Sequence, residues 1–327
     1  MTTDDAAPLA LVTDSPAAAL ALGSILESAK GYAAASKAPA TVRAYSREWL
    51  AFAAWCAERG AASLPCSPDV LACYVAAMAD AGRKPAGIDL ALAAVSQAHA
   101  SHGYDGRALR GSAPVRAVRA GVRRTVGTAQ RQAAPATADV LRLMVADLGA
   151  DLIGLRDRAL LLVGFAGAFR RSELAALDVG DLAFSPRGLE ITIRRSKTDQ
   201  EGRGRVVAVP LGSSADVCPV RSLRAWLDAA GIASGRVLRR VDRGAIGESL
   251  SDRSVAEVVK AAAARAGLEV ADFSGHSLRA GLATSAAQAG RSDRAIMAQT
   301  GHKSRAMVDR YVRSAERWND NAARGLL

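Results

Sequence analysis

Apolar residues in the first third of the chain recur at three- and four-residue steps, the spacing that builds one face of a helix. Trp49, Phe52 and Trp55 follow this rule, and the pattern stops at Gly60. Ser67 suits the N-cap of the next helix, because its side chain can accept a backbone N–H, and a proline follows at the first turn. The pattern predicts helices at residues 40–60, 67–82, 87–103 and 114–126.

The periodicity is lost over residues 127–137, GTAQRQAAPAT, which we predict to be a linker. Helical patterns resume after Thr137, the predicted N-cap, as helices with a break near Gly167. One stretch differs, because LEITIRRSK and RVVAVPL alternate around a glycine-containing turn and predict a β-hairpin. The later helical stretches are CPVRSLRAWLDAAG, SDRSVAEVVKAAAARAG, SGHSLRAGLATSAAQAG, SDRAIMAQTGH and SRAMVDRYVRSAERWND.

A chain of 327 residues, half of them apolar, predicts two domains with separate cores. We predict a flexible tail over residues 1–35, a helical domain over 36–126, the linker, and a second domain over 138–327 that ends in a tail helix. The first two dozen residues hold three aspartates and no lysine or arginine, so they lack the basic start of a signal peptide. The apolar run at 159–169 is about half of the roughly 20 residues that span a bilayer. We therefore expect a soluble cytoplasmic protein with no membrane partner.

The formal net charge of +11 favours a polyanionic partner, and nucleic acid is the leading candidate. The segment 106–138 holds seven arginines and no acid. Arg116, Arg119 and Arg123 fall on one face of the predicted helix there. A solvated helix face usually mixes both signs, so the pattern favours a phosphate-facing surface over a merely solvated one.

The sequence contains no recognisable motif for binding a metal ion or a nucleotide. The four cysteines show no Cys-x-x-Cys spacing and no histidine at zinc-finger distance, which predicts buried thiols in a reducing compartment. The chain also has no Gly-x-x-x-x-Gly-Lys loop for ATP. We expect neither a cofactor nor a metal.

Candidate chemistry lies in six residues of the second domain that gain meaning only as a set: Arg170, Lys197, His276, Arg279, His302 and Tyr311. Each alone suits a plainer role, such as a surface arginine, an exposed hairpin lysine or a packed tyrosine. Their order is specific, because Arg279 follows His276 by one helical turn and precedes His302 by 23 residues, with the tyrosine nine residues later. The set resembles the catalytic domain of tyrosine recombinases, the phage-integrase family that includes Cre and the Xer proteins. The likeness is specific over residues 138–312 and weaker over the helical domain.

DNA strand cleavage without hydrolysis calls for these residue types. It requires a nucleophile, charge neutralisation at the phosphoryl oxygens and an acid for the leaving 5′-hydroxyl. Arg170 and Arg279 offer planar forks of fixed charge for the oxygens. A tyrosine hydroxyl has an ordinary pKa of about 10. As a nucleophile, Tyr311 therefore needs a base or a strongly positive site.

The resemblance implies the remaining roles. His276 is the implied acid/base partner of the tyrosine, His302 contacts the scissile phosphate, and Lys197 protonates the departing 5′-oxygen. Glu173 matches an acidic position that orients the neighbouring histidine and arginine, although RSEL also suits a helix start capped by Ser172. The implied product is a 3′-phosphotyrosyl link, which conserves the bond energy for religation.

The resemblance also implies a mainly α architecture. A helical, SAM-like core-binding domain and a mostly helical catalytic domain with a small β-hairpin would form a C-shaped clamp on DNA. Recombination needs four strand cleavages, so a homotetramer on paired half-sites of double-stranded DNA is the implied working form of this prokaryotic, nucleoid-associated protein. Phosphate-backbone contacts give affinity rather than base readout. The candidates for them are Arg116, Arg119, Arg123, Arg194, Arg195, Arg203 and Arg205.

Three other readings stay open at this point. A type IB topoisomerase uses similar chemistry to nick and reseal one duplex. A catalytically silent DNA-binding regulator or accessory protein could keep the fold, although the complete set of six residues argues against it. A structural nucleoid binder explains the charge but none of the spacing. Within the recombinase reading, the sequence leaves open integration, excision or resolution, and the target site.

Overall fold

The computed structural model of the protein describes residues 16–128, 132–196, 199, 202, 204–309 and 311. The chain divides into two compact units, residues 1–130 and residues 131–327. Each unit has its own buried core, and the two are described separately. None of the helices in the described ranges is both long and apolar enough to cross a bilayer.

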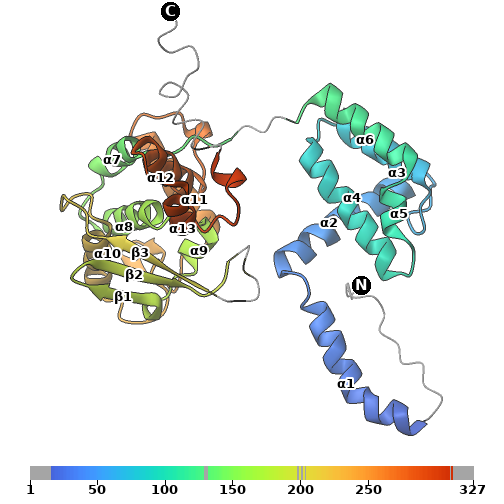
Figure 1. The fold of residues 1–327 in the computed structure, drawn as a ribbon, viewed down its shortest axis with the longest axis horizontal. Coiled ribbons are helices and arrows are strands. Elements are labelled where there is room, and N and C mark those ends of the chain that lie inside the picture. Colours follow the sequence, from blue (N-terminus) through green and yellow to red (C-terminus); the bar gives the residue numbers. More distant parts are fainter. Residues whose placement is uncertain are drawn as a thin grey trace, which may run out of the picture. The chain divides into compact units, whose positions relative to one another are not determined.

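The N-terminal unit is entirely helical in its described part (Figure 1). Helix α4 contacts α2, α3, α5 and α6. Its buried Ile88 and Leu92 pack with Phe52 and Leu71 in one apolar cluster. Ser67 caps α3 as predicted, because its side chain accepts the backbone N–H of Val70. The helices are α1 (Pro16–Ala34), α2 (Pro39–Ala57), α3 (Pro68–Asp80), α4 (Pro85–Ser101), α5 (Gly106–Arg110) and α6 (Ala113–Val126).

The predicted flexible tail over residues 1–35 differs from the structure. Residues 16–34 form helix α1, while residues 1–15 lie outside the described residues. The segment PAAALALGSILESAK is rich in alanine and leucine, which are among the strongest helix formers. Its own composition therefore favours a helix. The lack of basic residues bears on targeting and says nothing about helix formation.

The C-terminal unit is mostly helical, with a small antiparallel sheet (Figure 1). Helix α8 is its centre, in contact with α7, α9, α10, α11 and α12. The first elements are α7 (Ala138–Ala146), α8 (Leu152–Ala166), α9 (Arg171–Ala175), the 3-10 helix η1 (Val179–Asp181), β1 (Leu182–Ser185), β2 (Gly188–Ile193), β3 (Arg205–Pro210) and α10 (Pro219–Ala229). The later ones are β4 (Val241–Asp242), β5 (Ala245–Ile246), α11 (Asp252–Arg265), the 3-10 helix η2 (Val270–Asp272), α12 (Ser277–Gln288) and α13 (Asp293–Thr300).

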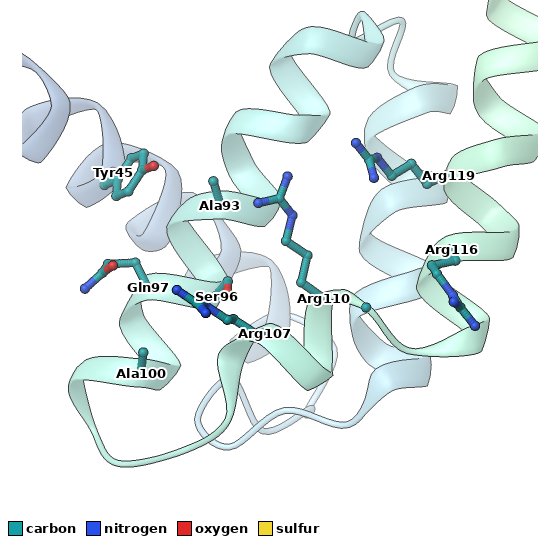
Figure 2. A pocket seen from close by; sticks show the side chains of 10 residues that line it. Tyr45, Ala93, Ser96, Gln97, Ala100, Arg107, Arg110, Arg116 and Arg119 are labelled. Carbon is teal, nitrogen blue, oxygen red and sulfur yellow. The ribbon is translucent and has the colours of Figure 1, made fainter.

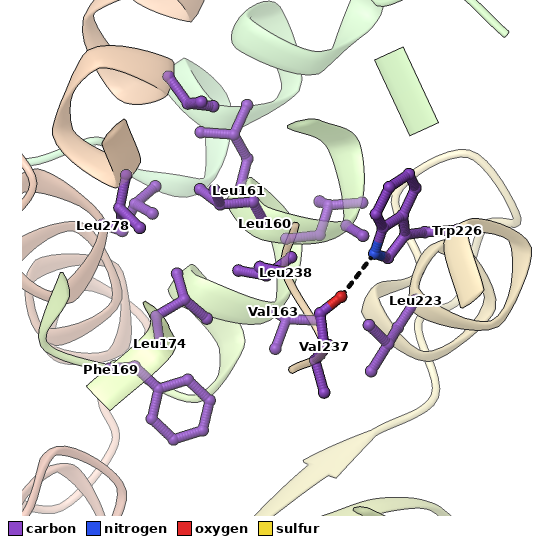
Figure 3. Close-up of a cluster of buried hydrophobic side chains, with 14 of the residues drawn as sticks. Leu160, Leu161, Val163, Phe169, Leu174, Leu223, Trp226, Val237, Leu238 and Leu278 are labelled. Atoms are coloured by element: carbon purple, nitrogen blue, oxygen red, sulfur yellow. Dashed lines mark hydrogen bonds between the residues drawn. The ribbon is translucent and has the colours of Figure 1, made fainter. Parts of the chain in front are cut away.

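The core of this unit surrounds the buried face of α8 (Figure 3). Leu160 and Leu161 are fully buried there. Trp226 of α10 is also fully buried, and its indole N–H donates to the carbonyl of Val237 at 2.8 Å. A buried indole donor needs such a partner, so this bond fixes α10 against the loop that follows it. The result is a rigid base for the residues at the end of α8.

The predicted hairpin is present as β2 and β3, with Ile191 opposite Val207. Both side chains are buried, as the alternating pattern requires. The sheet has a third strand, β1, that the sequence analysis did not predict, and α10 contacts β3. Lys197 and Arg203 at the tip and the predicted tail helix after residue 311 lie outside the described residues.

The predicted linker 127–137 is shorter in the structure, because its second half packs on the C-terminal unit. The N–H of Ala134 donates to the carbonyl of Asp272 at 2.7 Å, and that of Ala136 donates to Ser277 at 2.9 Å. Gly281 of α12 permits this approach, since a Cβ there would lie 1.8 Å from the Ala136 oxygen. This contact is made by residues far apart in the sequence, which local periodicity does not report.

Candidate active site

The break between α8 and α9 positions the first arginine. Gly167 turns the chain where a Cβ would collide with the Phe169 ring at 2.1 Å. Ala168 follows with a positive φ of 50°, which frees its carbonyl from the helix. Buried Phe169 then anchors the turn, and Arg170 stands at the N-cap of α9.

Glu173 lies beneath Arg170 and is 3% exposed. Its carboxylate accepts the backbone N–H of Arg170 at 3.0 Å and pairs with the guanidinium of the same residue. Its Oε2 also lies 3.5 Å from a guanidinium nitrogen of Arg205. Arg170, rather than Ser172, is thus the N-cap residue of α9, and Glu173 is paired with the guanidinium groups of Arg170 and Arg205.

Helix α12 places the second arginine. His276 is its N-cap residue and is exposed, whereas Arg279 one turn later is 1% exposed. One guanidinium nitrogen of Arg279 donates to the Ala168 carbonyl at 2.8 Å, and Nη2 is buried with no hydrogen-bond partner among the described residues. Burial, reinforced by the neighbouring Arg170 and opposed by Glu173, lowers the pKa of Arg279 to about 10. The side chain therefore stays charged at neutral pH, with one donor unused.

Tyr311 lies between the two predicted histidines. Its hydroxyl is 3.4 Å from Nε2 of His276, and its ring stacks on His302 at 6.1 Å between centroids. Nδ1 of His302 lies 2.8 Å from the hydroxyl of Thr300, a buried residue that the sequence analysis did not single out. Only 7% of the Tyr311 surface is exposed. Five of the six predicted residues thus lie in described parts of one unit, and Lys197 lies outside the described residues.

A small cavity of about 260 Å³ lies beside this cluster. Arg170, Arg205 and Lys303 contribute three cations to its lining, and Asp199 contributes a carboxylate. Lys303 was missed by the sequence analysis, although it directly follows His302. The cavity is therefore mainly basic, which suits an anionic group.

The other predicted contacts of the hairpin separate into two environments. Arg194 is exposed and pairs with Asp181 at 2.6 Å, and Arg195 is exposed. Arg205 instead has a side chain only 23% exposed and turns toward Glu173. Equal sequence signals along one hairpin therefore end in different places.

The N-terminal unit carries a basic groove of about 540 Å³, which Figure 2 shows from close by. Arg107, Arg110, Arg116 and Arg119 line it, together with Tyr45 of α2. Beside the groove, Asp89 of α4 pairs with Arg119 at 2.6 Å and with Arg123 at 2.7 Å. Partial burial pushes the pKa of Asp89 up, but the two paired guanidinium groups hold it below its ordinary value. The arginine-rich helix therefore has an acidic partner from outside its own segment.

A mostly helical unit that gathers a tyrosine, two histidines and two arginines defines the class of tyrosine recombinases. The model of the phage integrase family matches residues 136–317. An integrase/recombinase XerD homolog of Selenomonas ruminantium is 42% identical over 294 residues, which cover 88% of this chain and 85% of the relative. The tyrosine recombinase XerC of Pelotomaculum thermopropionicum is 33% identical over 46% of this chain and 47% of its own. The chain belongs to the phage integrase family, and it is a site-specific DNA recombinase of the tyrosine type.

Solved structures share the fold. The XerH site-specific recombinase bound to a palindromic difH substrate has a TM-score of 0.58 at 17% identity, over 79% of this chain and 71% of its own. A lambda integrase dimer bound to a COC′ core site has a TM-score of 0.56 at 17% identity, over 92% and 81%. The predicted fold class and enzyme class are confirmed, and none of the proteins named here favours the topoisomerase or silent-regulator reading.

Proposed function

We propose that Tyr311 is the nucleophile that attacks the scissile phosphodiester of double-stranded DNA. The phenolic oxygen bonds to phosphorus as the bond to the 5′-oxygen breaks, which leaves a 3′-phosphotyrosyl link and a 5′-hydroxyl. The phenolic proton passes to His276, and the leaving oxygen takes a proton from Lys197. The reverse exchange on a partner strand completes recombination without an outside energy source.

The observation that carries this proposal is the distance of 3.4 Å between the Tyr311 hydroxyl and Nε2 of His276. In the tautomer that carries its proton on Nδ1, the imidazole presents Nε2 as an acceptor for the phenolic proton. His302 stacks on the tyrosine ring and contacts Thr300, which supports a role in holding the ring and reaching the phosphate. The contact between Tyr311 and His276 is long, as is common before a bound substrate tightens an active site.

Charge neutralisation falls to Arg170 and Arg279. The buried Nη2 of Arg279 has a hydrogen to donate and no acceptor among the described residues, which is costly unless a ligand supplies one. A phosphoryl oxygen is such an acceptor, and its charge grows in the transition state. Burial thus makes this arginine a poor structural residue and a good anion ligand.

DNA is the partner that we propose for the exposed basic surfaces. We assign phosphate contacts to Arg116, Arg119 and Arg123 on α6 and to the exposed Arg194 and Arg195 beyond β2. Arg203 belongs to the same proposal but lies outside the described residues. The related XerH and lambda integrase structures contain DNA. We extend this to paired half-sites, a homotetrameric synapse and a cytoplasmic, nucleoid-associated protein.

The test requires a DNA site, which selection from a random-sequence duplex library with the purified protein can supply. A nick beside the cleavage position lets a short fragment diffuse away and traps the covalent intermediate. Wild type should form an adduct on a denaturing gel, and Tyr311→Phe should form none while binding the duplex normally. Tyr32→Phe, which removes the hydroxyl of an exposed tyrosine on α1, is the matched control and should form the adduct. Adduct formation by Tyr311→Phe would exclude the nucleophile assignment.

A further inference from the structure

Arg205 is the residue whose position departs most from its prediction as a DNA-backbone contact. We infer that Arg205 is a positioning residue of the active site, which holds Glu173 and the end of α13 so that Arg170 and His302 keep their places. The inference rests on the proposed function, because it assigns a part in the same cleavage step. Loss of the Arg205 side chain should therefore lower the rate of cleavage rather than the affinity for DNA.

The first contact of Arg205 is with a carboxylate that also pairs with Arg170. Nη2 of Arg205 lies 3.5 Å from Oε2 of Glu173, an ion pair without a hydrogen bond among the described residues, and Arg170 pairs with Oε1. The Glu173 side chain is 1% exposed, so water does little to screen these interactions. Glu173 thus forms ion pairs with two guanidinium groups rather than with one.

This sharing matters because of the charge that remains. Three partly or fully buried arginines, at positions 170, 205 and 279, lie around the buried carboxylate of Glu173, and half-buried Asp199 lines the cavity beside them. Burial lowers the pKa of Arg205, Glu173 opposes this effect, and Arg170 lowers the pKa further. If Glu173 faced Arg170 alone, one carboxylate would largely cancel the cation meant for the phosphate. The second guanidinium keeps the site positive, at a cost that only an anionic ligand offsets.

The second contact of Arg205 is with the segment that carries His302. Nη1 of Arg205 donates to the carbonyl of Gln299 at 3.1 Å, near the end of α13. The Gln299 amide in turn donates to the carbonyls of Ala166 at 2.6 Å and Ala208 at 3.1 Å. These bonds join the end of α13 to α8 and β3. His302 follows three residues later, so the arginine fixes the start of its loop.

Gly301 shows how closely this loop approaches the guanidinium. Its φ is +67°, and a Cβ there would lie 3.1 Å from Nε and 3.2 Å from Cζ of Arg205. A side chain would therefore be strained in conformation and crowded against the arginine. The backbone before His302 rests on the Arg205 side chain, which a surface arginine reaching for DNA would not permit.

Arg158 provides a matched control in the same unit. It is also half-buried, and its guanidinium donates to the carbonyls of Leu148 at 2.8 Å and Asp216 at 3.3 Å. Neither of these partners belongs to the cluster of Glu173, the histidines and Tyr311. Arg158→Met therefore removes a comparable fork without touching the active site.

The experiment compares Arg205→Met, Arg205→Lys and Arg158→Met in single-turnover cleavage of the nicked, selected duplex at saturating protein, alongside duplex affinity. Arg205→Met should cleave about 100-fold more slowly, since a shift of about 1 Å in reacting groups has that effect, with affinity changed less than about threefold. Arg205→Lys keeps the charge but loses the two-sided fork, and it should fall between wild type and Arg205→Met. Arg158→Met should cleave like wild type. Thermal melts report folding, and if Arg205→Met fails to fold, the Arg205→Lys rate decides.

A double-mutant cycle with Glu173→Gln separates positioning through Glu173 from an independent role. If Arg205 acts through this carboxylate, adding Arg205→Met to Glu173→Gln should slow cleavage by less than about fivefold. Multiplying effects would overturn the inference that Arg205 positions Arg170 through Glu173. So would a wild-type cleavage rate for Arg205→Met or Arg205→Lys combined with weaker binding and a reduced salt dependence. A wild-type protein that forms no adduct would instead reject the proposed function itself.

Discussion

The arginines of the two units differ in burial and in ion pairing. On α6 of the N-terminal unit they are exposed or half-buried, and Asp89 pairs with Arg119 and Arg123. In the C-terminal unit Arg170 and Arg205 are mostly buried and share one carboxylate. Arg279 is fully buried, and one of its nitrogens has no hydrogen-bond partner in the described part of the unit. One amino acid therefore serves two different purposes in one chain.

The physical consequence follows from the dielectric environment. Exposed charges interact weakly through water and salt, so they add affinity in small, additive, salt-dependent steps. Buried charges without full pairing cost stability and act strongly on a developing charge. The comparison predicts that α6 sets how tightly DNA is held, and that the buried group sets how fast it is cut.

The largest expected effect is that of Arg279→Met. Cleavage of the selected duplex should slow by about 10³-fold or more, because the donor that we propose for the phosphoryl oxygen is lost. Stability should stay within about 1 kcal/mol of wild type or rise, since methionine removes a buried charge with an orphan nitrogen. Single-turnover rates and thermal melts measure the two quantities on the same protein.

Arg156→Met is the control for that prediction, because Arg156 is also buried but fully engaged. It pairs with buried Asp157 through Nε at 2.9 Å and Nη2 at 2.7 Å. Its loss leaves Asp157 with Arg265, 3.9 Å away, as its one remaining ion-pair partner among the described residues, and it should destabilise the unit by about 3–5 kcal/mol. Equal losses of stability in Arg156→Met and Arg279→Met would break the distinction between structural and functional buried arginines.

A smaller effect is expected at the exposed surface. Arg116 is exposed and makes no ion pair within the described part of the chain. Arg116→Ala should weaken duplex binding several-fold and reduce the slope of log K against log salt by about 0.9, as one phosphate contact requires. Cleavage at saturating protein should be unchanged. Fluorescence anisotropy over a salt series measures both affinity and slope.

Asp89→Asn tests the same surface with the opposite sign. It keeps the shape of the side chain and releases Arg119 and Arg123 from their carboxylate, so binding should tighten by about threefold with a steeper salt slope. Weaker binding would mean that Asp89 orders the two arginines for DNA rather than competing with it.

Local sequence patterns predict the secondary-structure elements but not the contacts between distant residues. The helices at Pro39 and Pro68, and the hairpin around residues 189–209, follow from caps and periodicity within each segment. The catalytic set came from its order and spacing, which matched a known family. The partners of other arginines could not be predicted in this way, because Asp89 lies 30 residues from Arg119, and Gln299 lies 94 residues from Arg205.

The same limit applies to the environment of each arginine. Arg194 and Arg205 flank one hairpin and give identical signals in the sequence. Strand β3 begins at Arg205, and its first side chain turns toward α9 and α13, whereas Arg194 follows the end of β2 and faces solvent beside Asp181. Which of the two is buried depends on packing of α13 against the sheet, and periodicity within the hairpin carries no information on that.

The smallest expected effect concerns acid, where the units differ again. His99 is buried in the N-terminal core, where Nε2 accepts the N–H of Cys66 at 3.0 Å and Nδ1 contacts the Val95 carbonyl. Burial lowers its pKa from 6.5, and nearby His102 lowers it further, against the Val95 contact. The unfolded chain then binds more protons, so stability is complete above about pH 6.5 and falls as the pH drops toward the lowered value.

The loss of stability should be about 1 kcal/mol, the scale of one hydrogen bond. It should appear first in the N-terminal unit, because the buried cations described in the C-terminal unit are guanidinium groups, which stay protonated. Hydrogen exchange of the peptide that contains Cys66, compared between about pH 7.5 and about pH 5.5 after correction for intrinsic rates, measures it locally. His99→Gln should abolish the pH dependence of that peptide, because the amide does not titrate. An unchanged pH dependence in His99→Gln would assign the acid sensitivity to another group.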